Sequence, residues 1–175
     1  ERLGRGNTKG THRIVYFGDA ANWGMKEGQK ERSQNTLFWR NISEHIDSWG
    51  DAYSGRILDY SGDVAPDHYG YIQIYEIAVS DPEKFISAHK KIVSQARELM
   101  EDRPVAFGSF DIGIPNGATH FVAVGYKGVS DNIVMKSKIE QALAKERKEY
   151  FKNRGDVTNT GNFDLRILKT YGSFN

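Results

Sequence analysis

The sequence contains no cysteine, which excludes disulfide bonds, zinc–thiolate sites, iron–sulfur clusters and a cysteine nucleophile. It also lacks an excess of charge, because 24 lysines and arginines are balanced by 23 aspartates and glutamates. Proteins that bind nucleic acids usually carry a strong basic excess. A helix that crosses a membrane needs a run of about 18 apolar residues, and no such run is present. We therefore expect neither a nucleic-acid partner nor a membrane span.

The absence of cysteine leaves the cellular compartment open, because a chain without thiols suits both reducing and oxidising surroundings. The chain begins at Glu1 and shows no apolar segment typical of a signal peptide. Two locations follow from this. One is the cytoplasm, and the other, if a signal is removed before Glu1, is the periplasm or the exterior.

The sequence does contain enough apolar and aromatic residues for one folded domain. Hydrophobic residues make up 38% and aromatic residues 12% of its 175 positions, which is sufficient to bury a core. Residues 1–11 differ, because they hold three glycines, three cations and no core-forming pattern. We predict a flexible leader at 1–11 and a single α+β domain at 12–175.

Hydrophobic periodicity predicts the order of the strands and helices. Runs rich in β-branched and aromatic residues predict six strands, at 12–18, 55–61, 71–79, 105–113, 120–126 and 163–171. Apolar residues at helical spacing predict three helices, at 29–49, 82–101 and 131–153. The polar segment 155–161, which begins and ends with glycine, is predicted to be a loop.

A short internal repeat indicates how these elements combine. The triplet Val-Ser-Asp at 79–81 recurs at 129–131, and both copies lie between a predicted strand and a predicted helix. Two βαβ units joined by a hairpin form the ferredoxin-like, split-βαβ arrangement, with an antiparallel sheet and helices on one face. Residues 71–171 fill this pattern once, and residues 12–61 add an N-terminal β-α-β piece. The predicted fold class is α+β.

In this pattern the chain resembles the dimeric α+β barrel superfamily, which includes antibiotic-biosynthesis monooxygenase-like and stress-responsive A/B-barrel proteins. The resemblance is carried by residues 71–92, 119–139 and 163–171. It implies that two sheets close face to face into a barrel, as a homodimer or as a tandem repeat in one chain. It also implies a cavity for a small ligand and, in some members, oxygenation without a cofactor. We accordingly expect no cofactor, with haem as the alternative that the resemblance allows.

Two histidines are candidate catalytic residues. His89 falls on the apolar side of the second predicted helix. His120 begins the strand 120–126 and shares one side of it with Val122 and Val124. A histidine that faces a cavity can act as a base, shuttle a proton or bind haem. The alternative for His89 is a hydrogen-bonded core histidine, and the alternative for His120 is a surface position.

Four further residues are candidates for ligand binding. Tyr71, Gln73 and Tyr75 share one side of their strand, and we expect Ile72 and Ile74, on the other side, to meet the helices. The Tyr/Gln/Tyr side then faces either a ligand pocket or a dimer interface.

Arg166, on the last predicted strand, either binds an anionic ligand through both of its guanidinium N–H edges or pairs with Asp111.

We expect no metal site. The sequence has no His-Glu-x-x-His motif. His68 lies in a predicted loop with Asp63 and Asp67, and a carboxylate pair beside a histidine can bind a metal ion. The polarity of a loop explains the same residues.

Two functions remain open. The first is binding, or oxidative transformation, of a small aromatic or apolar ligand in a barrel cavity by an enzyme of the cofactor-independent monooxygenase type. The second is a module without enzymatic activity that associates with itself. Both predict a homodimer.

Overall fold

The computed structural model describes residues 1–6, 9–19, 21, 33–62 and 66–171. The chain divides into two compact units. One contains residues Ile14–Asp51, and the other contains Glu1–Arg13 together with the chain from Ala52 onward. The larger unit holds the sheet and all of the candidate residues.

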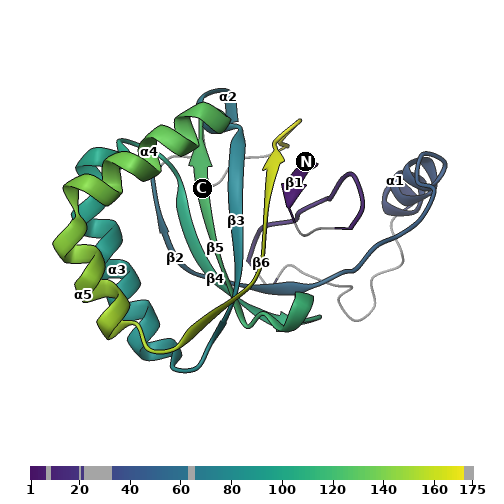
Figure 1. Cartoon of the computed structure of the whole chain (residues 1–175). Coiled ribbons are helices and arrows are strands. Elements are labelled where there is room, and N and C mark those ends of the chain that lie inside the picture. Colours follow the sequence, from purple (N-terminus) through teal and green to yellow (C-terminus); the bar gives the residue numbers. More distant parts are fainter. Residues whose placement is uncertain (7–8, 20, 22–32, 63–65, 172–175) are drawn as a thin grey trace. The chain divides into compact units, whose positions relative to one another are not determined.

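The larger unit is built on a six-stranded sheet, whose strands follow the order β1-β6-β3-β5-β4-β2 and pair antiparallel throughout (Figure 1). The strands are β1 (Arg2–Gly6), β2 (Ser54–Ser61), β3 (Tyr71–Val79), β4 (Val105–Ile112), β5 (His120–Tyr126) and β6 (Val157–Arg166). Strands β3 to β6 and the helices between them follow the split-βαβ order. The α+β, ferredoxin-like fold class is therefore confirmed.

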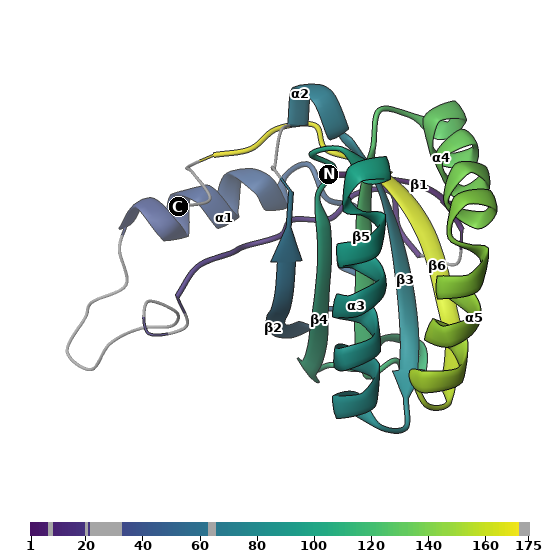
Figure 2. The ribbon, with the colours of Figure 1, turned by 90° about the vertical axis from the view of Figure 1, so that its left-hand side faces the viewer.

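Three helices cover one face of this sheet (Figure 2). They are α3 (Pro82–Met100), α4 (Val129–Ala142) and α5 (Ala144–Asn153). Two short helical turns lie elsewhere, α2 (Pro66–Tyr69) and a 3-10 turn, η2 (Pro115–Gly117). No helix in the described part of the chain is long and apolar enough to span a membrane.

The two copies of the repeat begin their helices differently. Asp81 caps α3, since its Oδ1 accepts a hydrogen bond from the backbone N–H of Lys84 at 3.1 Å. Asp131 lies inside α4 and instead accepts a hydrogen bond from the buried guanidinium of Arg103 at 2.6 Å. The repeat thus predicts both helix starts, but only the first copy supplies a side-chain cap.

The predicted helix 131–153 is two helices in the structure. The break falls at Leu143, whose backbone dihedrals are φ −116° and ψ 34°. Both α4 and α5 stay on the same side of the sheet (Figure 1). From this break α5 continues beside α3 and ends shortly before β6 (Figure 2).

Two predictions about strands are wrong. Residues 2–6, expected in a flexible leader, form β1 and pair with β6, Arg2 opposite Arg166 and Leu3 opposite Leu165. The segment 155–161, expected to be a loop, contains the first half of β6. Both segments are rich in glycine and polar residues, and pairing with a neighbouring strand overrides their low strand propensity.

Along the N-terminal part of the chain the described elements follow the order β1, α1 (Ser33–Ser43), β2, with β1 and β2 at opposite edges of the sheet and α1 in the smaller unit. Residues 12–18 form no strand, apart from a single bridge between His12 and Arg2. Part of the predicted helix 29–49 lies outside the described residues. In the smaller unit the ring of Trp39 contacts those of Tyr16, Phe38 and Trp49, and these three rings remain exposed.

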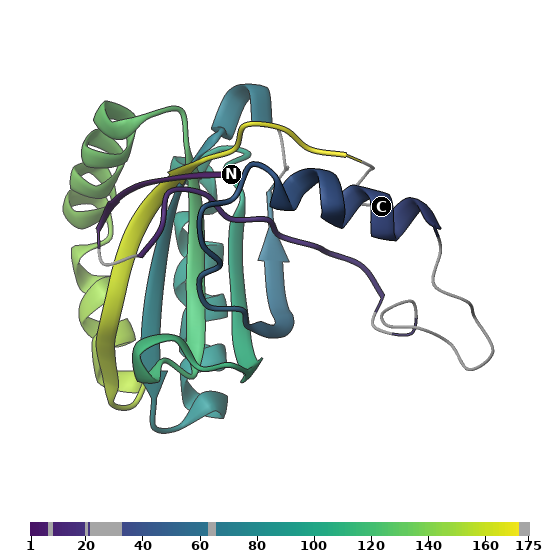
Figure 3. The ribbon, with the colours of Figure 1, turned by 90° about the vertical axis from the view of Figure 1, so that its right-hand side faces the viewer.

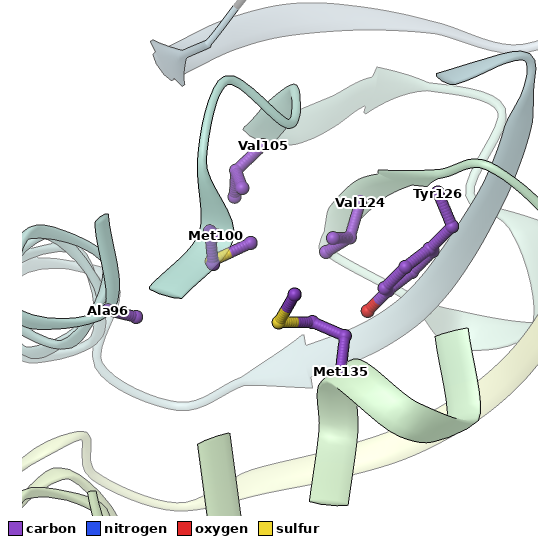
Figure 4. Close-up of a cluster of buried hydrophobic side chains, with 6 residues drawn as sticks. All are labelled: Ala96, Met100, Val105, Val124, Tyr126 and Met135. Atoms are coloured by element: carbon purple, nitrogen blue, oxygen red, sulfur yellow. The ribbon is translucent and has the colours of Figure 1, made fainter. Parts of the chain in front are cut away.

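The main core lies between the sheet and the helices. One cluster joins α3 and α4 to β4 and β5 through Ala96, Met100, Val105, Val124, Tyr126 and Met135 (Figure 4). A second cluster, nearer the start of α3, contains Ile77, Val79, Phe85 and Phe107.

The two sides of β3 are the reverse of the prediction. Tyr71 and Tyr75 pack with the helix-side clusters, whereas Ile72 and Ile74 pack on the opposite face of the sheet. On that face, which Figure 3 views, Leu3 of β1 packs against the cluster and Cζ of Arg13 lies 5.6 Å from the ring centroid of Phe163. The prediction assumed that only helices bury apolar side chains, and the N-terminal strand supplies a second apolar layer.

Candidate functional site

The structure brings the two candidate histidines to one aromatic residue. His89 comes from α3 and His120 from β5, and both rings lie 5.3 Å from the ring of Phe107, centroid to centroid. The ring of Phe85 stacks on His89 at 5.6 Å. Both histidines are buried. Phe107 separates the two imidazoles, so they do not bond to each other.

Burial keeps both histidines neutral at neutral pH. Desolvation lowers the pKa of His89 from 6.5 to about 4, and the charge of Asp59 only partly opposes this. Desolvation also lowers the pKa of His120, against the opposing charge of Asp111. The Nδ1 atom of His120 lies 2.8 Å from the hydroxyl of Thr119. A neutral imidazole can accept a proton or a hydrogen bond from a neighbouring group.

A cavity of about 320 Å³ lies beside His89, between the sheet and the helices. Its walls are mainly apolar or aromatic, with a few polar groups. They are formed by Tyr75, Ile77, Phe85, His89, Val122, Tyr150, Arg154, Val157 and Asn159. A small volume with apolar walls and few polar groups is typical of a small-molecule site. We call it the α5 cavity, because Tyr150 and Arg154 come from α5 and its C-terminus.

Two of the site residues predicted from the sequence, His89 and Tyr75, line the α5 cavity. Tyr75 is half-buried, and the ammonium of Lys136 lies 5.4 Å from the centroid of its ring. His120 is not among the lining residues, although it touches Phe107 behind them. The assignment of catalytic and binding roles to these residues stays a prediction.

Tyr71 and Gln73 make structural contacts away from the cavity. The hydroxyl of Tyr71 donates to Oδ2 of Asp164 at 2.5 Å, and burial together with this bond raises the pKa of Tyr71 to about 12. Despite its own burial, Asp164 has a lowered pKa because Tyr71 and Arg5 donate to it. These contacts connect β1, β3 and β6.

Gln73 is buried, and its polar atoms have protein partners. Its Nε2 donates to the carbonyl of Phe163 at 3.1 Å, and its Oε1 accepts from the amide of Asn132 at 3.3 Å. This side chain therefore links the sheet to α4.

Arg166 and Asp111 do not pair. Asp111 forms an ion pair with Arg56 instead, with 2.7 Å between Nε and Oδ2. Arg166 is exposed, and it takes part in no ion pair within the part of the chain that the structure describes. The pairing fails because Asp111 lies on β4, near the opposite edge of the sheet from β6.

Three polar lining residues, Tyr150, Arg154 and Asn159, were not predicted from the sequence. Tyr150 and Arg154 are one helical turn apart, so their spacing predicts a shared helix face, but nothing in the pattern shows that this face turns toward the sheet. Asn159 lies in the segment that was predicted to be a loop. These residues reach the cavity because α5 ends at Asn153 and the chain returns directly as β6.

The residues around His89 do not fit a haem, and metal binding at the His68 segment stays untested because that segment is only partly described. Among the described residues, no group of three histidines and carboxylates lies close enough together to hold a metal ion. Asp63, one of the two carboxylates near His68 in the sequence, lies outside the described residues. A haem macrocycle is larger than a cavity of about 320 Å³, and the ring of His89 is stacked on Phe85. We therefore derive no chemistry through a haem.

No protein-family model matches the chain, and no curated protein matches its sequence. A similar solved structure is described as that of a major regulator of staphylococcal pathogenesis. The alignment covers 71% of this chain and 75% of that chain, with 13% identity and a TM-score of 0.39. Similarity at this level carries no argument about function.

Proposed function

We propose that the α5 cavity binds a small ligand that is mainly aromatic or apolar. The observation that carries this proposal is the cavity itself, a space of about 320 Å³ that opens between the helices and the sheet. Its apolar residues supply the surface that a ligand would remove from water. The imidazole of His89, the phenols of Tyr75 and Tyr150 and the amide of Asn159 supply polar contacts that would orient it.

A second hollow suits this role less well. It measures about 470 Å³ and lies in the groove between α3 and α5. Its lining residues include charged side chains of both signs, and an ion pair joins Lys91 to Glu149 at 3.4 Å. A ligand without charge that enters this groove must displace water from those side chains, which is costly.

Binding is the proposed function of the cavity, and a reaction of the bound ligand is a separate step. His89 is the one lining imidazole, and its low pKa makes it a neutral hydrogen-bond acceptor near pH 7. An oxidative reaction of the bound ligand, which the family resemblance implies, stays a prediction.

The neutral bicyclic amide 2-naphthamide tests the proposal. We expect it to bind with a dissociation constant below about 1 mM, which corresponds to a free energy of about −4 kcal/mol. Val157→Phe fills part of the cavity and should weaken binding by about tenfold or more. Isothermal titration calorimetry measures both values. Val134→Phe makes the same change at an exposed position on α4 and should leave the affinity unaltered.

A second variant guards against misfolding of Val157→Phe. Val157→Leu adds a single methylene group and should weaken binding by a smaller factor. If the wild-type protein does not bind the amide, or if the folded Val157 variants bind it as well as wild type does, the proposal is wrong.

A specific observation also favours self-association. Apolar side chains are exposed on the sheet face opposite the helices, around β2, β4 and the loop before β2. They are Tyr53, Ile57, Tyr60 and Ile112, and the half-buried ring of Phe110 contacts those of Tyr53 and Phe121; we call these six residues the open-face patch. A contiguous exposed apolar surface is typical of a protein interface. We propose that a second copy of the chain covers this patch in a homodimer.

A further inference from the structure

The C-terminus of α5 places a single arginine at the α5 cavity. Arg154 is the C-cap residue of the helix, and its backbone N–H donates to the carbonyl of Tyr150 at 3.0 Å. The next residue, Gly155, has a φ of 73°, a left-handed conformation that glycine adopts without a steric penalty. The chain then turns into β6. The backbone of Arg154 is thus fixed by the local turn, and its side chain lines the cavity.

The guanidinium of Arg154 rests on aromatic rings. Its Cζ lies 5.4 Å from the ring centroid of Tyr150 and 4.6 Å from that of Phe151. Within the part of the chain that the structure describes, no carboxylate forms an ion pair with it. The guanidinium also donates a hydrogen bond to the hydroxyl of Tyr150. Because a guanidinium has five N–H donors, others are able to donate to a ligand.

The charged lining of the cavity is a single cation. None of its lining residues is an aspartate or glutamate, and Arg154 is the one lining residue that is charged at neutral pH, since burial keeps His89 neutral. The nearest acidic influence on His89 is Asp59, which is itself paired with Lys90 at 3.7 Å. Lys136 adds a second cation near Tyr75.

From this arrangement we infer that the ligand is a small aromatic or apolar carboxylate, with its carboxylate bound by Arg154 and its apolar body packed among Tyr75, Ile77 and Phe85. The planar fork of a guanidinium matches the two oxygens of a carboxylate. The inference rests on the proposed function, and it names the chemical class of the ligand.

The test compares two probes that differ in charge. 2-Naphthoate and 2-naphthamide have the same ring system, and only the first is anionic near pH 7. We expect the wild-type protein to bind naphthoate about tenfold more tightly, because an ionised carboxylate accepts stronger hydrogen bonds from a guanidinium than a neutral amide does. In Arg154→Gln the naphthoate affinity should fall to that of naphthamide, while the naphthamide affinity is retained. Arg154→Lys, which keeps the charge, should retain part of the preference.

Arg147→Gln is the matched control. Arg147 lies on α5, pairs with Glu140 at 3.1 Å and is not a lining residue. Its replacement should leave the preference for naphthoate unchanged.

Three outcomes overturn the inference. If the amide binds as tightly as the carboxylate, or if Arg147→Gln abolishes the preference as Arg154→Gln does, the carboxylate class is wrong while the cavity remains a binding site. If Arg154→Gln lowers stability but keeps the preference, Arg154 only offsets the negative end of the α5 dipole. If neither probe binds, the proposed function itself fails.

Discussion

At the scale of single residues, the two buried histidines make the stability of the protein depend on pH. The pKa of His89 is lowered from 6.5 to about 4 in the folded protein, so below pH 6.5 the unfolded chain binds a proton that the folded protein does not. The contribution of His89 to the free energy of unfolding is therefore fully present above pH 6.5, and it decreases as the pH falls toward 4. His120 shifts in the same direction. The buried carboxyl of Glu76 has a raised pKa and opposes the trend.

We predict that lowering the pH from about 7 to about 4.5 reduces the free energy of unfolding by about 2–3 kcal/mol through His89. His89→Phe keeps an aromatic ring beside Phe85 and Phe107 but cannot be protonated. Urea denaturation at both pH values measures the effect, and the variant should lose less stability by about that amount. An equal loss in wild type and variant would contradict the burial of a neutral imidazole.

At the scale of single elements, β1 shows how a glycine-rich segment becomes an edge strand. A side chain at Gly4 would collide with the carboxylate of Asp164 on β6. That carboxylate accepts hydrogen bonds from the backbone N–H of Arg5 at 2.8 Å and from the hydroxyl of Tyr71 at 2.5 Å. Gly4 is therefore needed for close approach of the two strands.

Gly4→Ala should displace Asp164 and weaken the pairing of β1 with β6. We expect a loss of about 1–3 kcal/mol in the free energy of unfolding, and faster hydrogen exchange at the amide of Arg5. Gly128→Ala is the control, because its φ is 171° and a Cβ there meets no atom within 4 Å. If both variants behave alike in hydrogen exchange, the close approach at Gly4 is not what stabilises β1.

The elements with strong periodicity could be predicted from the sequence. Strands β3 and β5 and helix α3 begin and end within about two residues of the predicted positions. Strand β1, the first half of β6 and the break at Leu143 could not be predicted. In each of these, contacts between segments far apart in the sequence, or a local change of backbone direction, outweigh local propensity.

The candidate site was predictable only in part, for the same reason. His89 was placed on the apolar side of its helix by spacing alone, and it does line a cavity. Whether the side chains of Tyr71 and Gln73 face the helices depends on which face of the sheet the helices cover. The sequence of a single strand does not show this. Arg154 could not be predicted, because its place at the cavity depends on how the chain passes from the end of α5 to the start of β6.

At the scale of the whole molecule, the open-face patch leads to a prediction about assembly. We expect a homodimer in solution. The double variant Ile57→Glu/Ile112→Glu should shift it to a monomer, because two charges in an apolar interface are costly to desolvate. Light scattering after size-exclusion chromatography measures the mass. Ile133→Glu, at an exposed position on α4, should remain dimeric.

A monomeric wild-type protein would contradict this account of the patch. A dimer that the double variant leaves intact would also contradict it, because it would place the interface elsewhere.

The central claim is that a ligand enters the α5 cavity, and methyl-detected NMR tests it most directly. Ile77, Val122 and Val157 line the cavity, whereas Ile57 and Ile112 belong to the open-face patch. When 2-naphthamide is titrated into the wild-type protein, we predict saturable shifts in the methyl signals of the first three residues and little change in the other two. Shifts confined to Ile57 and Ile112, or none at all, would contradict the account.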